Sequence, residues 1–204
     1  MLPASTLFLD VSAQRDLWPG GAWPLVDADG AGNVAALFAL AASLGIRQGG
    51  SRCVHLAGQP PPYAPRHCEI GSDGAAAAAG CDTAQPAVLL GSGDHAAAAL
   101  DRTHAYYLTT GCGGPPDADP LARAALDHLT AGIRDTVVFG AAIERGLDRM
   151  VDACLRRRIR THVVLDASAP ADPAAAQQVI ASWKRRGVDA LTTATVARLL
   201  TRAR

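Results

Sequence analysis

The chain has 204 residues, 49% of them hydrophobic, and its 19 Lys and Arg side chains equal its 19 Asp and Glu side chains in number. A zero net charge gives no electrostatic reason to expect binding to nucleic acid or to an acidic membrane. No apolar run is long enough to span a bilayer. The hydrophobic content suffices for one well-buried core, and we expect residues 1–204 to form a single domain.

Cysteine usage indicates the redox compartment. The sequence holds five cysteines without a Cys-x-x-Cys pair, so any disulfide pairing leaves one thiol over. The first residues do not show the pattern of a secretory signal peptide. Reduced thiols fit these features better than a disulfide framework does. We therefore expect a soluble, cytoplasmic protein.

Short apolar runs and helical periodicities alternate along the chain. The expected strands are residues 5–11, 46–55, 88–90, 104–108, 135–140, 161–166 and 189–191. The expected helices are residues 29–44, 121–130, 144–157, 173–186 and 192–204. Strands that alternate with helices predict an α/β protein with three layers, α/β/α, around a central and mostly parallel sheet.

The stretch VVFGAAIERGLDRMVDACL, residues 137–155, is the most informative part of the sequence. A run of β-branched and aromatic residues meets Gly140 and then changes to a helical pattern. In an α/β protein, this strand, turn and helix N-terminus present backbone N–H groups to a ligand.

Four segments of the chain resemble those of the isochorismatase-like hydrolases, which include nicotinamidases and other cysteine amidases. The segments are FLDVSAQRDLWPGGAWPLVDADG, PPYAPRHCEIGSDG, VVFGAAIERGLDRMVDACLRR and RTHVVLDASAP. They follow the order of the family and are distributed between residues 8 and 170. The resemblance implies the isochorismatase-like fold.

The resemblance also assigns the catalytic positions. Asp10 matches the family aspartate, which acts as general base or acid. The family lysine falls at Thr109 or Thr110, and the nucleophilic cysteine falls at Gly146. An activated nucleophile with a base and a cation is thus reduced to the acid alone.

The turn between strand and nucleophile helix carries further implied features. Members of the family have a cis peptide here, which implies a cis bond between Ala141 and Ala142. Glu144 and Arg145 stand where the family has pocket residues, and we expect them to refill the substrate pocket. Trp18 and Trp23, which flank the PGG sequence, are expected to cap that pocket or to lie in a dimer contact.

A metal site is the second feature that the resemblance implies. In nicotinamidases, zinc is bound by an Asp-x-His pair and by a histidine of the Pro-Pro-His segment. The matching residues are Cys53, His55 and His67, with Cys68 as a competing ligand. One Cys and two His are good zinc ligands and leave a fourth position open to water. The alternative interpretation is that they are remnants, with Cys53 buried as a small apolar residue.

Three hypotheses of function remain open. The first is a pseudoenzyme that serves as a binding or assembly subunit. The second is a hydrolase that does not need the cysteine, because isochorismatases carry glycine at that position and cleave a vinyl ether with the aspartate as general acid; here Asp10 would hold the proton. The third is a relocated nucleophile at Cys112, in the loop TTGCGG.

The resemblance to this family also implies binding partners for the chain. We expect a small-molecule ligand or substrate and a homo-oligomer, without nucleic acid or membrane contacts.

Overall fold

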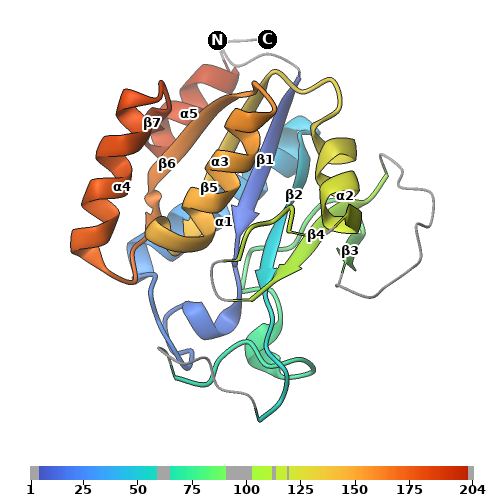
Figure 1. Ribbon diagram of the computed structural model, residues 1–204, viewed down its shortest axis with the longest axis vertical. Coiled ribbons are helices and arrows are strands. Elements are labelled where there is room, and N and C mark those ends of the chain that lie inside the picture. The colour runs from blue at the N-terminus through green and yellow to red at the C-terminus, as the bar shows by residue number, and fades with distance from the viewer. Residues whose placement is uncertain (1–4, 59–64, 91–102, 112–113, 119, 202–204) are drawn as a thin grey trace.

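The structure, a computed structural model, describes residues 5–58, 65–90, 103–111, 114–118 and 120–201. Within these residues, seven strands form one sheet in the order β3-β4-β2-β1-β5-β6-β7, and every neighbouring pair is parallel (Figure 1). The strands are β1 (Thr6–Val11), β2 (Arg47–Cys53), β3 (Ala87–Leu90), β4 (Ala105–Thr110), β5 (Asp135–Ala141), β6 (Arg160–Ala169) and β7 (Asp189–Leu191).

Helices cover the two faces of this sheet. The α helices of the described chain are α1 (Ala28–Leu44), α2 (Pro120–Thr130), α3 (Asp148–Arg156), α4 (Pro173–Arg185) and α5 (Thr193–Thr201). One apolar core lies under α1 and α5, and the other lies under α2, α3 and α4 (Figure 1). The predicted three-layer α/β architecture is therefore confirmed.

The first strand shows why the sheet is buried on both faces. Leu7 and Leu9 point into the core under α2, α3 and α4, whereas Phe8 points into the core under α1 and α5. In the core under α1 and α5, the centroid of the Phe139 ring lies 6.1 Å from that of Phe8 and 5.9 Å from that of Phe38. Both ring pairs are in edge contact. A strand that is apolar on both faces is typical of a parallel sheet between two helical layers.

The ends of the first helix follow from local sequence. The Asp27 side chain accepts a hydrogen bond from the Gly30 N–H at 2.7 Å and caps the N-terminus of α1. Gly45 ends the helix in the left-handed conformation, with φ of 64°.

Two element boundaries differ from prediction. Strand β6 continues to Ala169 instead of ending at residue 166, because its register against β5 shifts between Val138 and Gly140 and lets the strand resume. The expected helix 144–157 begins as a π-helical turn, η3 (Ile143–Leu147), in which Arg145 is not helical, and becomes α-helical only at α3. The last three residues of the expected final helix lie outside the described part of the chain.

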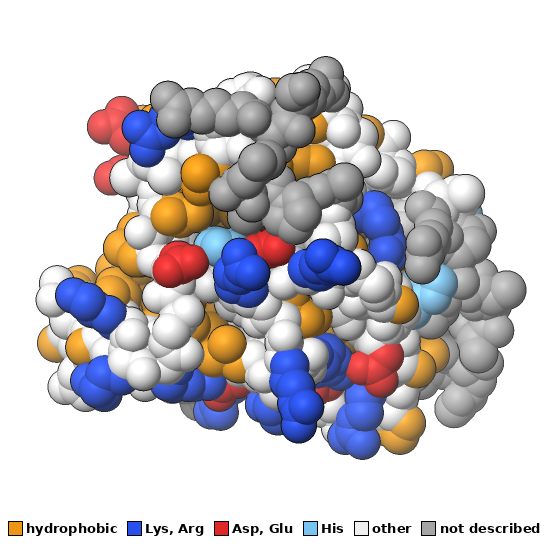
Figure 2. Space-filling view, turned by 90° about the horizontal axis from the view of Figure 1, so that it is seen from above, with side chains coloured by type: hydrophobic (Ala, Val, Ile, Leu, Met, Phe, Trp, Pro, Cys, Tyr) orange, Lys and Arg blue, Asp and Glu red, His pale blue; other side chains and the backbone are white. Residues whose placement is uncertain are grey.

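The amino edge of the sheet carries an ion-pair network. The Asp135 carboxylate lies 3.0 Å from His162 Nε2 and 3.5 Å from Arg160 Nη1, and His162 Nδ1 lies 3.0 Å from Asp189. Figure 2, which views this end of the molecule, shows acidic and basic side chains interspersed on the visible face. This edge therefore presents mixed charge instead of a patch of one sign.

Strands β1 and β2 approach closely where Asp10 pairs with Gly50. A methyl group at Gly50 would collide with the backbone carbonyl oxygen of Asp10. We predict that Gly50→Ala lowers the free energy of unfolding by about 1–3 kcal/mol or more, because the strands must separate. Gly32 lies in α1 with open space around it, so Gly32→Ala is the control and should raise stability by about 0.5–1 kcal/mol. Equal effects of the two substitutions in urea unfolding would contradict this packing.

Candidate functional site

Strands β4, β2, β1 and β5 are neighbours and end together at the carboxyl edge of the sheet, where sites in parallel α/β proteins lie. A small cavity at this edge is lined by Trp23, Cys53, His67, Thr110, Ala141, Ala142, Arg145 and Gly146, among others. It therefore brings together the predicted nucleophile, lysine and metal positions.

The cavity beside Gly146 is nearly filled. Its volume is about 20 Å³, and Leu17, Leu25 and Trp23 form part of its wall. Arg145 also lines it, with its guanidinium carbon 5.8 Å from the Trp23 ring centroid. A space of this size holds about one water molecule and no organic substrate.

The turn after β5 has the backbone that the resemblance implied. The peptide bond between Ala141 and Ala142 is cis. The N–H groups of Arg145 and Leu147 both donate to the Ala142 carbonyl, each at 3.1 Å. The cis bond and the two hydrogen bonds determine the start of η3, and Gly146 lies within this turn.

Asp10 is buried and bonded within the protein. Its Oδ1 accepts hydrogen bonds from the Ala13 N–H at 3.2 Å and from Arg52 Nη1. Its Oδ2 is buried without a hydrogen-bond partner in the described chain, and the residues that line the cavity beside Gly146 do not include Asp10. Burial by itself lowers the pKa of Arg52, but the nearby Asp10 carboxylate raises it above its usual value overall. The two side chains thus form a buried ion pair.

Tyr107 completes the surroundings of this pair. Gly50 stands in register between Asp10 on β1 and Tyr107 on β4, so no side chain separates them. The guanidinium carbon of Arg52 lies 3.6 Å from the centroid of the Tyr107 ring. The Tyr107 hydroxyl is buried and interacts with both Asp10 and Arg52, although no hydrogen bond of acceptable geometry forms to a described residue. Burial, and then the negative charge of Asp10, raise the pKa of Tyr107 well above 10.0.

Arg52 and Tyr107 are the residues that the sequence analysis missed. The family lysine was sought after β4, where Thr109 Oγ1 donates to the Leu90 carbonyl and Thr110 Oγ1 donates to the Arg52 carbonyl. The cation that contacts Asp10 comes instead from β2. The available signal was an arginine inside the buried strand RQGGSRC, where a charged side chain needs a partner.

The three predicted metal ligands lie together. Cys53 Sγ is 3.2 Å from His55 Nε2 and 3.6 Å from His67 Nε2, and the ligand atoms of all three residues lie within 4.8 Å of one another. His67 Nδ1 is 2.7 Å from the Pro65 carbonyl oxygen, which makes Nδ1 the donor and leaves the Nε2 lone pair for a metal.

This donor set fits zinc. Zinc–sulfur and zinc–nitrogen bonds of about 2.3 and 2.0–2.1 Å in a tetrahedron place sulfur and nitrogen about 3.5 Å apart. The two sulfur–nitrogen distances lie on either side of that value. Cys68 is not part of the group: its N–H donates to Asp16 at 2.6 Å, and its sulfur lies 4.0 Å from the Gly74 carbonyl.

Two predicted pocket residues lie elsewhere. The Glu144 carboxylate accepts hydrogen bonds from the N–H groups of Ala171 at 3.1 Å and Asp172 at 2.9 Å, and so it fixes the loop before α4 instead of refilling the pocket. Trp18 is 6% exposed and packs in the core under α1, whereas Trp23, the other tryptophan beside PGG, lines the cavity. An acid at a helix start bonds the nearest free backbone N–H groups, which here belong to a neighbouring loop.

The remaining cysteines do not supply a nucleophile in the described chain. Cys112 lies outside the described residues, so the relocated-nucleophile hypothesis is not addressed by the structure. Burial raises the pKa of Cys154 to about 11 and that of Cys81 to about 12, so both are protonated at neutral pH.

Solved structures share this fold. The chain is similar to a nicotinamidase/pyrazinamidase of Acinetobacter baumanii, with 17% identity, a TM-score of 0.67 and coverage of 95% of this chain and 99% of that one. A pyrazinamidase of Pyrococcus horikoshii in complex with zinc has 19% identity, a TM-score of 0.64 and coverage of 93% and 99%. An isochorismatase family protein of Desulfovibrio vulgaris has 18% identity, a TM-score of 0.68 and coverage of 96% and 97%.

No family model and no curated protein matches the chain. The structural similarity, at identities below 20% for these three proteins, shows a shared fold. None of the described helices combines the length and apolarity that a bilayer crossing requires.

The raised pKa of Tyr107 gives a pH prediction. The folded chain keeps the phenol proton to a higher pH than the unfolded chain, so above pH 10.0 the unfolded chain binds fewer protons. The free energy of unfolding should therefore fall as the pH rises through about 10. Tyr107→Phe removes this contribution and should lose less stability between about pH 8 and about pH 10.5 in urea unfolding. An equal loss in both proteins would show that Tyr107 ionises normally in the folded state.

Proposed function

We propose that this chain, which has the fold of the isochorismatase-like hydrolases, is a zinc-binding pseudoenzyme that serves as a binding or assembly subunit. The observation that carries this proposal is the cavity of about 20 Å³ beside Gly146. A site that holds about one water molecule has no room for the amide or ether of a substrate.

The chemistry of the three catalytic positions supports the proposal. Glycine at position 146 cannot form a covalent acyl intermediate. The neutral Thr110 cannot replace a lysine that balances negative charge. The Asp10 carboxylate is neutralised by Arg52 and lies away from the cavity. Each group needed for cysteine amidase chemistry is thus missing or engaged elsewhere.

The zinc part of the proposal rests on the Cys53, His55 and His67 cluster. These side chains would supply three ligands, and the small cavity beside Cys53 and His67 has room for a water molecule as the fourth. When bound, zinc supplies a cross-link between ligands that are distant in sequence and polarises a coordinated water. In this chain the cross-link would fasten the segment with Pro65 and His67 to the end of β2.

A hydrolase that does not need the cysteine is the alternative. The buried Asp10 Oδ2, which lacks a hydrogen-bond partner in the described chain, favours it, since a general acid needs a free oxygen to carry the proton. The contact with Arg52 opposes it, because the guanidinium already occupies the other carboxylate oxygen in a buried ion pair.

The wider biological setting stays a prediction. A small-molecule partner, a homo-oligomer, a single domain over residues 1–204 and a cytoplasmic location are inferred from the resemblance and from composition. The four cysteines within the described residues carry free thiols, which is compatible with that location.

We predict that the purified protein releases no ammonia from nicotinamide at an ordinary enzyme rate and does not cleave isochorismate. Gly146→Cys should also remain inactive on nicotinamide, because a thiol restores neither the substrate space nor the lysine. A nicotinamidase serves as the positive control, and circular dichroism checks that the variant folds. Ammonia release by the unchanged protein would refute the proposal. Isochorismate cleavage that Asp10→Asn abolishes would establish the alternative.

Metal analysis tests the zinc site. Protein purified with zinc and then dialysed should retain about one zinc per chain, as a site of three protein ligands predicts. Replacing two ligands, with Cys53→Ser and His67→Ala together, should remove the metal. Cys68→Ser is the matched control, because Cys68 is another buried cysteine near the cluster but is not part of it. Zinc retained by the double variant, or lost equally in the control, would exclude this site.

A further inference from the structure

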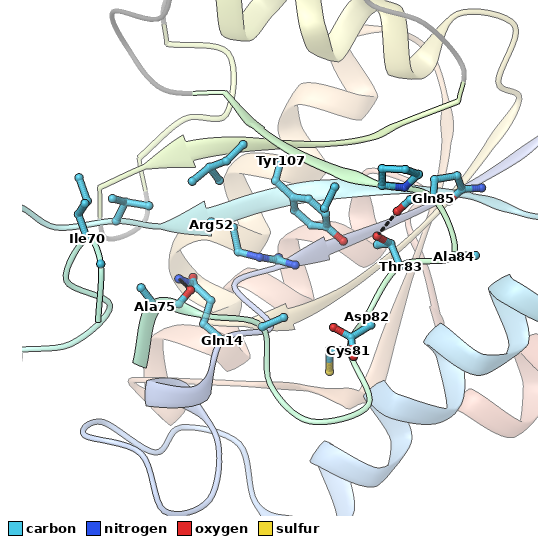
Figure 3. A pocket seen from close by; sticks show the side chains of 16 residues that line it. Gln14, Arg52, Ile70, Ala75, Cys81, Asp82, Thr83, Ala84, Gln85 and Tyr107 are labelled. Carbon is cyan, nitrogen blue, oxygen red and sulfur yellow. Dashed lines mark hydrogen bonds between the residues drawn. The ribbon is translucent and has the colours of Figure 1, made fainter. Parts of the chain in front are cut away.

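A second, much larger cavity lies between strands β2, β4 and β3 and the segment 70–86. Its volume is about 560 Å³, within the range of about 300–1,000 Å³ that small-molecule pockets occupy. Figure 3 shows Arg52 and Tyr107 extending from the sheet on one side, with Ala75, Cys81 and Asp82 on the segment opposite.

This cavity is separate from the site beside Gly146. Adjacent residues of a strand point to opposite faces, and accordingly Arg52 lines the large cavity while Cys53 lines the small one. Neither the nucleophile and lysine positions nor the metal ligands belong to its lining. A ligand here would therefore not occupy the site that the family uses for catalysis.

The walls of the large cavity are mostly apolar. Val54, Pro86 and Ala87 contribute to them. Ile70 and Leu89 also line it, with 59% and 52% of their surfaces exposed. They are two of the three exposed large hydrophobic residues within the described part of the chain. Exposed apolar side chains gathered around a concave surface are typical of a binding site.

Most polar groups of this cavity are already engaged. The Gln14 amide donates to the Cys53 and Ala75 carbonyls at 2.9 and 3.0 Å and accepts from the Cys53 N–H at 2.8 Å. Thr83 Oγ1 donates to the Gln85 carbonyl at 2.6 Å. These side chains hold the wall in place and leave the recognition of a ligand to other groups.

Two donors at the base remain for a ligand. The Tyr107 hydroxyl lies beside the Asp10 carboxylate and the Arg52 guanidinium, but it makes no hydrogen bond of acceptable geometry to a described residue, and Tyr107 is 2% exposed. Arg52 has five N–H donors, whereas its bonds to Asp10 and to the Ser51 carbonyl both leave from Nη1. Both groups donate, so at the base they select a hydrogen-bond acceptor. Gln85 Oε1, elsewhere in the lining, is a buried acceptor without a hydrogen-bond partner in the described chain, and it suits a donor such as an amide N–H.

Charge at the base favours a neutral ligand. The Arg52 cation is balanced by the Asp10 carboxylate in direct contact, so the base carries no net charge. Asp82, on the exposed part of the wall, adds a negative charge. An anion would meet this charge without an unpaired cation to compensate for it.

We propose that the large cavity is a binding site for a small, uncharged and mostly apolar molecule that carries a carbonyl group. The carbonyl oxygen accepts hydrogen bonds from the Tyr107 hydroxyl and the Arg52 guanidinium, and the apolar body packs between Leu89, Ala87 and Ile70. This inference is independent of whether the site beside Gly146 is catalytic.

Benzamide, with benzoate as its charged counterpart, is the probe that tests the site, and protein-observed NMR titration measures both. Benzamide should bind more tightly than benzoate. The substitution Tyr107→Phe should lower the affinity for benzamide by about tenfold, which is the effect of one lost hydrogen bond. Ala87→Phe should abolish binding, because Ala87 and Leu89 alternate onto the cavity side of β3. Ala190→Phe is the matched control and should leave binding unchanged, since Ala190 is an exposed alanine on the opposite edge strand β7.

Further measurements distinguish benzamide binding in the large cavity from binding at the candidate metal cluster. Benzamide binding should survive the combined Cys53→Ser and His67→Ala substitutions, and loss of binding in that protein would place the probe at the cluster and overturn the proposal. Absence of benzamide binding up to its solubility limit would also overturn it, as would equal affinity in Ala87→Phe. Benzoate bound as tightly as benzamide would refute the uncharged class of ligand.

Discussion

The buried ion pair between Asp10 and Arg52 is the interaction on which the carboxyl edge of this sheet depends. Because Gly50 has no side chain, strands β1 and β2 approach closely beside the pair. The ring of Tyr107 lies against the guanidinium. Removal of one partner from such a pair leaves an uncompensated buried charge, which typically costs about 3–5 kcal/mol. The acid that the resemblance assigns to catalysis is thus part of the packing of the sheet, and its freedom to take part in chemistry is correspondingly small.

Strand β2 divides the two sites because its side chains alternate. The Arg52 side chain lines the large cavity. The side chain of the next residue, Cys53, lines the small cavity and belongs to the candidate metal cluster. The Gln14 amide joins the two regions, since it bonds the Cys53 backbone and the Ala75 carbonyl together. The two cavities thus share one strand but lie on opposite faces of it.

Much of the fold followed from local pattern. Each strand and helix formed close to its expected residues. The family resemblance implied the cis peptide before Ala142 and grouped the three metal ligands that the structure brings together. The end of β6 was missed, because a register shift against β5, and not composition, lets the strand resume through Asp-Ala-Ser-Ala.

The sequence by itself determined the layers, the parallel sheet and the presence of glycine at position 146, because periodicity and residue identity are local properties. Only the tertiary structure decided which cation meets Asp10. Arg52 is 42 residues away along the chain, and the order of strands β4, β2 and β1 brings it into contact. The same strand order put Tyr107 beside the pair and left one cavity nearly filled and the other open. Contacts between strands depend on register and on the volumes of side chains from several elements, which no single segment encodes.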